Sequence, residues 1–351
     1  MLQCSAGQKI ELDNCFFVRT VMMILIVIYH SIVFWSANKW FVVMPSCQAE
    51  VLGALADYLN TFHVYTFVLV SGYVYYALRF EQGKYERTFP FLINKTKRLL
   101  VPYVFTSIIW VIPHNLIWYK PDTSKIINDF VLGLAPDQLW FLLMLFWVYL
   151  IAYPLSNFAK KYAALAIPLL ISIYIVGVVL PFPDYFQIKT ALRCQIFFWI
   201  GFYIRELDLL CLFRGKKKWI RIGIISVSFV VLFFAGRISY PKTAVYKILF
   251  IVIDIITRMV GAITAFCLLQ MIAGRVKQYI YIYISGFSKY SMIIFLFHQQ
   301  IIQCTLAFCK GIHIPLLISG ICFAVALITS TLMAAVVYKV KPLRICFTGK
   351  A

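Results

Sequence analysis

The stretch that decides the fold is residues 16–37, FFVRTVMMILIVIYHSIVFWSA, in which one arginine and one histidine interrupt an otherwise largely apolar run. A helix needs about 20 predominantly apolar residues to cross a hydrocarbon core of about 30 Å. The stretch therefore predicts a membrane-spanning helix. The residues before it are polar and acidic, and the run is long enough to cross, which favours an uncleaved first span over a removed signal peptide.

The rest of the chain has the same character. Of the 351 residues, 63% are apolar, 17% aromatic and only 13% charged. An ordinary soluble domain carries about 25% charged residues because its surface faces water. The composition excludes a soluble globule and predicts a single integral-membrane domain over residues 1–351, with no separate soluble domain.

Ten apolar runs follow one another along the chain, and a backbone exposed to lipid must satisfy its hydrogen bonds within its own helix. The fold class we expect is therefore all-α, a polytopic membrane protein with about ten transmembrane helices. The sixth and seventh runs have the shortest apolar cores. The runs are 16–37, 58–78, 99–119, 139–155, 163–181, 191–204, 222–236, 248–272, 290–308 and 314–338.

The net charge of +20 comes from cations in the short loops between these runs. Counted on alternating sides, 21 Lys and Arg fall on one face and 8 on the other. Cytoplasmic loops are enriched in Lys and Arg, so both termini are expected in the cytoplasm. The chain is expected to be a multi-pass protein of the cell inner membrane. Membrane lipid, and not nucleic acid, is the expected partner of these charges. Ten cysteines without a CxxC pair predict no metal site.

Two polar residues of the first span carry the functional hypothesis. Arg19 and His30 are eleven residues apart, which is about three turns of helix, so they share one face about 16.5 Å apart along the axis. A charge at membrane depth is costly and marks a candidate site. The alternative is that Arg19 extends to the lipid headgroups and His30 bonds a neighbouring helix.

Other polar residues lie within or beside the later spans. His298 ends a ninth span that runs in the same direction as the first, so it is expected at the depth of His30. Arg193 has no acid near it in the sequence and is expected to face either a substrate cavity or a carbonyl cluster. Asp254 and Arg258, four apart, are expected to neutralise each other on one helix face.

Three histidines lie near the predicted ends of spans. His63 begins the second span, where the following Ser71–Gly72 step is equally typical of close helix packing. His114 and His313 are expected at the outer interface.

A basic cluster precedes the third span. Lys95 and Arg98 are three apart and would line one side of a helix start as a compact anion site. A polyanionic cofactor could dock there. The alternative is that these cations only set the orientation of the helix.

Six segments, by their order and spacing along the chain, resemble the integral-membrane acyltransferase-3 family over about residues 10 to 310. The spacing of Arg19 and His30 is the most specific of them. Lys95 stands where that family more often has arginine, which keeps the charge but loses the planar fork. The segments are Leu12–Asp13 with the Arg-x10-His pair, FVLVSGY at 67–73, FLINKTKRLLVPY at 91–103, LWFL at 139–142, RCQIFFWIGFY at 193–203 and YSMIIFLFH at 290–298.

Members of that family move acyl groups, often acetyl, from coenzyme A to extracytoplasmic sugars. The resemblance implies acyl-CoA, acetyl-CoA in particular, as co-substrate, with its phosphates held by Lys95, Arg98 and Arg19. His30 is then the expected general base on a hydroxyl of a sugar or polysaccharide, and direct transfer and an acyl-histidine relay both stay open. Candidates for orienting the acceptor or stabilising the oxyanion are His298, Arg193, Trp140 and His63.

Two other functions fit the sequence. Ten helices with buried polar residues also suit a transporter or flippase of a glycan or lipid-linked sugar. In a third interpretation the protein is an assembly subunit of a polysaccharide-synthesis complex, and the intramembrane charges form contacts that hold its helices together. The sequence leaves the acyl group, the acceptor and the oligomeric state open.

Overall fold

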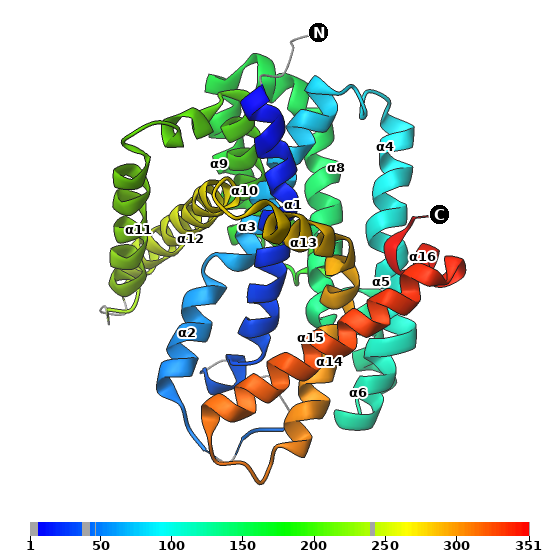
Figure 1. Cartoon of the computed structure of the whole chain (residues 1–351). Helices are drawn as coiled ribbons and strands as arrows, with labels where there is room; N and C mark the ends of the chain where they lie inside the picture. Colours follow the sequence, from blue (N-terminus) through cyan, green and yellow to red (C-terminus); the bar gives the residue numbers. More distant parts are fainter. Residues whose placement is uncertain (1–5, 37–42, 46, 239–242, 351) are drawn as a thin grey trace. The chain divides into compact units, whose positions relative to one another are not determined.

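The computed structural model describes residues 6–36, 43–45, 47–238 and 243–350. It is 83% helical, and no strand occurs in these ranges (Figure 1). The all-α fold class is therefore confirmed. Ala37, the predicted end of the first span, lies outside the described residues.

The described parts of the ten apolar runs lie mostly in helices, although the second run, 58–78, begins in the helix Glu50–Asn60 and is interrupted by a turn at residues 61–62. The α-helices are α1 Ala6–His30, α2 Glu50–Asn60, α3 His63–Tyr76, α4 Thr88–Lys95, α5 Val101–Thr106, α6 Ile112–Trp118, α7 Thr123–Ile126, α8 Trp140–Lys161, α9 Ala163–Val179, α10 Ile188–Glu206, α11 Lys218–Ala235, α12 Ala244–Ala273, α13 Gln278–Phe287, α14 Ser291–Phe308, α15 Pro315–Lys339 and α16 Lys341–Thr348. Short 3-10 or π turns join them at η1 Val33–Trp35, η2 Ala77–Glu81, η3 Thr96–Leu100, η4 Ser107–Val111, η5 Ile127–Val131, η6 Asp137–Leu139, η7 Tyr185–Gln187, η8 Leu209–Phe213 and η9 Ser288–Tyr290.

Among the described residues, seven helices are long and apolar enough to cross a membrane. By length and apolarity, the predicted number of ten membrane-spanning helices is not reached. Of the other three runs, α3 has 14 residues before its π turn, α9 has 17, and α10 contains Lys189, Arg193 and Arg205. The seven helices are Ile10–Trp35, Thr88–Trp118, Asp137–Lys161, Lys218–Ala235, Ile248–Ala273, Gln278–Phe308 and Pro315–Lys339.

The third predicted span lies in one helical stretch from Thr88 to Trp118. Pro90 lies in the first turn of this stretch, where proline is tolerated, and two prolines lie further along it. Pro102 follows the π turn Thr96–Leu100, and Pro113 follows the π turn Ser107–Val111. Proline has no N–H and its ring clashes with the carbonyl four residues back. A wider turn just before Pro102 and Pro113 lets the helix continue without a break.

The chain forms two compact units. The first comprises residues 1–26, 54–83 and 197–288. Within it α11 packs beside α12 (Figure 1), and α3 packs on α10. A side chain at Gly72 would overlap the carbonyl oxygen of Phe198, and one at Gly201 would overlap that of Leu69, so the two backbones are in direct contact. The Ser71–Gly72 step is thus a close helix-packing contact.

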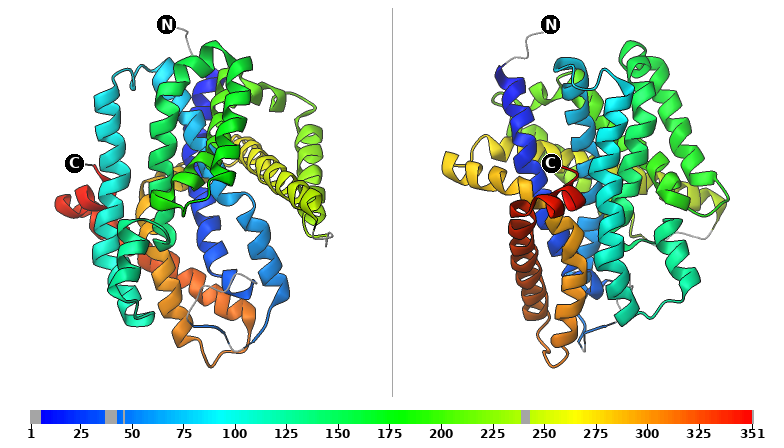
Figure 2. Two further views of the ribbon diagram at one scale, coloured as in Figure 1. Left: turned by 180° about the vertical axis from the view of Figure 1, so that it is seen from behind. Right: turned by 90° about the vertical axis from the view of Figure 1, so that its right-hand side faces the viewer.

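The second unit comprises residues 27–53, 84–196 and 289–351. Within it α14 and α15 pack against each other, and both can be followed in the right-hand view of Figure 2. The indole of Trp35 donates to Ser319 Oγ at 2.9 Å, which ties the turn after α1 to α15. The end of α1 is therefore held in the same unit as α14.

Large apolar side chains are exposed along the spans as well as buried between them. On α11, Ile224, Val227, Val231 and Phe234 are each more than half exposed. Water would make such a surface unfavourable, whereas lipid tails accept it. The helices are apolar on both faces, as a membrane environment requires.

Candidate active site

Two of the predicted histidines meet in the second unit. His30 ends α1 and His298 lies on α14, and their ring centroids are 4.9 Å apart at an interplanar angle of 60°. The ring of Tyr29 also contacts His30, and the centroids of these two rings are 4.9 Å apart. This contact agrees with the expectation that the two imidazoles lie at the same depth along the membrane helices.

The hydrogen bonds of His298 indicate which of its nitrogens carries the proton. The residue is fully buried, and Nδ1 lies 2.9 Å from the carbonyl oxygen of Ile294 and 2.8 Å from that of Phe295. Carbonyl oxygens only accept, so Nδ1 must be the N–H donor. Nε2 of the neutral ring then holds a lone pair, and it has no hydrogen-bond partner among the described residues.

A pair of glutamines supports α14 beside His298. Gln138 and Gln300 are buried and exchange two amide hydrogen bonds, of 2.7 and 2.9 Å. Gln138 Nε2 also donates to the carbonyl oxygen of Leu296 at 2.8 Å. The start of α8 is therefore tied to the part of α14 that carries His298.

Trp140 lies at this junction. It is the first residue of α8, two positions after Gln138, and it is half-buried. The ring of the next residue, Phe141, lies 5.6 Å from Phe295, whose ring is 6.2 Å from His298. The structure thus brings the Trp140 segment, His298 and His30 together in one unit.

Arg19 lies on the same helix as His30, and α1 is continuous between them, so their eleven-residue spacing is helical throughout. Its side chain is half-buried. Within the described part of the chain, Arg19 has no hydrogen bond or ion pair. A guanidinium in a membrane-spanning helix without a protein counter-charge is suited to an anionic ligand or to a lipid headgroup.

Lys95 is buried in an aromatic cage. Its Nζ lies 3.4 Å from the ring centroid of Tyr149, 5.0 Å from that of Tyr85 and 5.4 Å from that of Phe91. The faces of aromatic rings attract a cation. Arg98, by contrast, is exposed. The two cations have different surroundings, and an anion would reach Arg98 first.

The structure corrects the interpretation of Arg193 as a cation with no acid near it. Its guanidinium lies 3.8 Å from Asp184 and donates to Thr190 Oγ1 at 3.0 Å, and its side chain is 46% exposed. The partner comes from the turn before α10, where sequence spacing gave no sign of it. Arg193 belongs to the second unit, but among the described residues it makes no hydrogen bond or ion pair with either histidine of the pair.

His63 belongs to the first unit, whereas His30 and His298 belong to the second. It is buried at the start of α3, with Nδ1 2.5 Å from the carbonyl oxygen of Leu59. The predicted Asp254–Arg258 pair is confirmed, at 2.7 Å, and Arg258 also bonds the hydroxyl of Tyr65.

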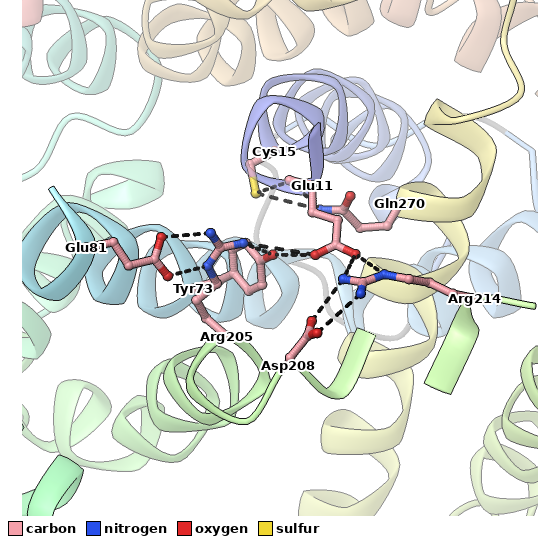
Figure 3. Close-up of polar contacts among 8 residues, drawn as sticks. All are labelled: Glu11, Cys15, Tyr73, Glu81, Arg205, Asp208, Arg214 and Gln270. Carbon is pink, nitrogen blue, oxygen red and sulfur yellow. Dashed lines mark hydrogen bonds and ion pairs between the residues drawn. The ribbon is translucent and has the colours of Figure 1, made fainter. Parts of the chain in front are cut away.

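An ion network in the first unit centres on Arg205 of α10 (Figure 3). Its guanidinium makes two parallel hydrogen bonds to Glu81, of 2.7 and 2.8 Å, and one to the hydroxyl of Tyr73 at 2.8 Å. Glu11 of α1 lies 4.0 Å away and accepts from Tyr73 at 3.3 Å. A buried arginine is tolerated here because several acceptors surround it.

A second arginine extends the network. Arg214 bonds Glu11 at 2.6 Å and Asp208 at 2.9 Å, and Gln270 of α12 donates to the backbone carbonyl of Glu11 at 2.9 Å (Figure 3). Burial lowers the pKa of Arg214, but the two carboxylates outweigh it and hold the pKa above its ordinary value. These contacts tie the first helix to α3, α10 and α12.

Sequence reasoning missed the glutamine pair and the arginine network. The first had a signal, because Gln299, Gln300 and Gln303 follow His298 directly in an apolar helix. The arginine network had no such signal, because its partners are separated by up to 259 positions.

The fold and the site define a multi-pass helical membrane protein with a pair of histidines in contact between its helices. A comparison with protein families finds that the profile described as "Acyltransferase domain" matches residues 12–340, nearly the whole chain. The chain therefore belongs to the acyltransferase-3 family, and it is a membrane acyltransferase. Neither the curated proteins nor the solved structures contain a match to it.

Proposed function

We propose that this protein is an O-acyltransferase that moves an acyl group, acetyl in particular, from cytoplasmic acyl-CoA to a hydroxyl of an extracytoplasmic sugar or polysaccharide. The contact between His30 and His298 carries the proposal, because it supplies paired imidazoles inside the membrane helices of an acyltransferase-3 chain. A sugar hydroxyl is a weak nucleophile until a base removes its proton.

In this mechanism His30 takes the proton of the acceptor hydroxyl as its oxygen attacks the thioester carbonyl. The tetrahedral intermediate then expels the coenzyme A thiolate, which takes up the proton from His30. The products are the sugar ester and free coenzyme A. His298 supports the step because the lone pair on its Nε2 can accept the proton or a hydrogen bond from the hydroxyl.

The donor end of the substrate is assigned to the basic residues. In the second unit, exposed Arg98 offers its guanidinium group to the phosphates of coenzyme A, and Lys95 adds its charge from within the aromatic cage. Half-buried Arg19, in the first unit, is a separate candidate for an anionic group of the substrate. Charge holds the polar end of the cofactor while apolar helix surfaces accept the pantetheine arm. Both termini and these basic loops lie in the cytoplasm in this proposal.

The test is acetyl transfer by purified full-length protein in lipid nanodiscs, with labelled acetyl-CoA and surface glycan as acceptor. We expect His30→Ala to lower the rate about 10²–10⁴-fold, which is the usual effect of losing a general base. His298→Ala should lower the rate by a smaller factor. The matched control is His313→Ala, since His313 is exposed outside α14. Binding of acetyl-CoA should persist in all three variants.

Three results would contradict the proposal. One is full activity of His30→Ala. A second is movement of glycan across the bilayer by the wild type without any ester formed, which would indicate a transporter. A third is loss of protein rather than of turnover in both histidine variants on an immunoblot, which would indicate a structural subunit.

A further inference from the structure

One face of the stretch Thr88–Trp118 carries polar atoms that lack partners. Thr106 Oγ1, Trp110 Nε1 and His114 Nε2 are buried and make no hydrogen bond to the described residues. The three residues are four positions apart, so they form a stripe along the helix. The neighbouring Ser107 instead bonds the carbonyl of Tyr103 at 2.8 Å, the usual arrangement for a hydroxyl in a helix.

The stripe continues through buried His114 to half-buried Asn115 and Trp118. His114, 8% exposed, has Nδ1 at 3.2 Å from Asn115 Oδ1, and Asn115 Nδ2 donates to Asp137 Oδ2 at 2.8 Å. The other carboxylate oxygen of Asp137 has no partner within the described ranges. The ring of Trp118 stacks on that of His114 at 6.2 Å and 26°. Asp137 holds a left-handed backbone conformation with φ of 47°.

The chemistry of these groups selects one class of ligand. Trp110 Nε1 only donates, Asp137 Oδ1 only accepts, and the hydroxyl of Thr106 does both. If His114 Nδ1 donates to Asn115, His114 Nε2 is an acceptor. An anion would be repelled by the acceptors, and an apolar chain would leave every group unsatisfied. A polyhydroxy compound matches both kinds, and the aromatic faces of Trp110 and Trp118 suit its C–H faces.

The stripe is anchored beside the histidine pair. The ring of Trp110 lies 5.1 Å from that of Phe297, the residue before His298. At the other end, Gln138 follows Asp137 and is bonded to the carbonyl of Leu296 on the same helix. All these residues belong to the second unit. A ligand that satisfied the stripe would therefore reach the part of α14 that carries His298.

We infer that the face formed by Thr106, Trp110, His114 and Trp118, with Asn115 and Asp137, binds the sugar acceptor through its hydroxyl groups. This inference rests on the proposed O-acyltransferase function, which it deepens by naming where the acceptor is held. Side chains move to admit the sugar and make the buried atoms available. The sugar hydroxyls then supply the hydrogen bonds that these atoms lack in the free protein.

The test measures sugar binding and acetyl transfer separately on the full chain in nanodiscs. The probes are tritiated methyl glycopyranosides, used in equilibrium dialysis without acetyl-CoA, and the same glycosides as acceptors with labelled acetyl-CoA. The variants are Asp137→Asn, Thr106→Val and Trp118→Phe. The matched control is Thr305→Val, because the hydroxyl of Thr305 is already bonded to the carbonyl of Ile301 at 2.8 Å.

We expect each of the three variants to weaken glycoside binding and raise the acceptor KM about tenfold, with the acetyl-CoA KM and the rate at saturating acceptor unchanged. Thr305→Val should match the wild type. The inference is overturned if the wild type binds no glycoside, or if the variants bind and transfer as the wild type does. Binding lost in the variants without acetyl transfer by any form would support the sugar site and reject the acyltransferase proposal.

Discussion

Arg205 and Arg214 belong to one ion network but differ in their exposure to solvent. The side chain of Arg205 is 1% exposed and that of Arg214 is 42% exposed. Removing one member of a buried pair leaves the other charge without compensation, whereas an exposed pair is screened by water. The same residue type should therefore have very different weight at the two positions.

We expect Arg205→Ala to lower the free energy of unfolding by about 3–5 kcal/mol, because the buried guanidinium is the ion-pair partner of half-buried Glu81. Arg214→Ala should cost about 0–1 kcal/mol. Unfolding of the protein in detergent, followed by circular dichroism, measures both. Equal losses in the two variants would show that burial does not govern this network.

At the scale of the helices, the contact between α3 and α10 depends on two glycines. Gly72 meets the backbone of Phe198, and Gly201 meets the backbone of Leu69. Small residues let membrane helices approach closely, and the gain comes from packing because lipid tails are as apolar as the helices. Tyr73, which follows Gly72, bonds Arg205, so this contact also positions the ion network.

Gly72→Ala should destabilise the protein by about 1–3 kcal/mol, because the added methyl group forces the two backbones apart. Gly223→Ala is the matched control. Gly223 lies on α11 with nothing near its Cβ position, so the change should be neutral or stabilising by about 0.5–1 kcal/mol. Thermal unfolding in one detergent compares the two. A stability of Gly72→Ala at or above that of Gly223→Ala would refute the packing argument.

At the scale of the whole molecule, the distribution of Lys and Arg predicts the orientation in the membrane. The cation-rich face should be cytoplasmic, and it includes the loop that contains Cys211. Cys47 falls in a loop on the opposite face. Both cysteines are at least partly exposed, and neither forms a disulfide. They are therefore natural reporters of topology.

A membrane-impermeant maleimide should label Cys47 in intact cells and Cys211 only after the cytoplasmic side is opened. The variants Cys47→Ser and Cys211→Ser identify each signal on a gel, since each should remove one labelling event. Labelling of Cys211 in intact cells would invert the predicted orientation and move the coenzyme A site to the wrong side of the membrane.

The sequence alone determined the helical membrane fold, because the length and apolarity of a span are local properties that lipid imposes on each helix separately. It also determined the local pairs, such as Asp254 with Arg258, whose spacing on one helix fixes their distance. The sequence did not determine the number of crossings, since α3 and α9 are short for a span and α10 is charged.

Only the tertiary structure decided which distant side chains meet. It paired His30 with His298 and Gln138 with Gln300, enclosed Lys95 in aromatic rings and gave Arg193 an acidic partner from outside its own helix. In a chain this apolar, many helix faces could pack together, so the hydrophobic pattern does not select one arrangement. Buried polar groups make the choice, because each needs a partner of complementary chemistry, and periodicity within one helix does not reveal where that partner lies.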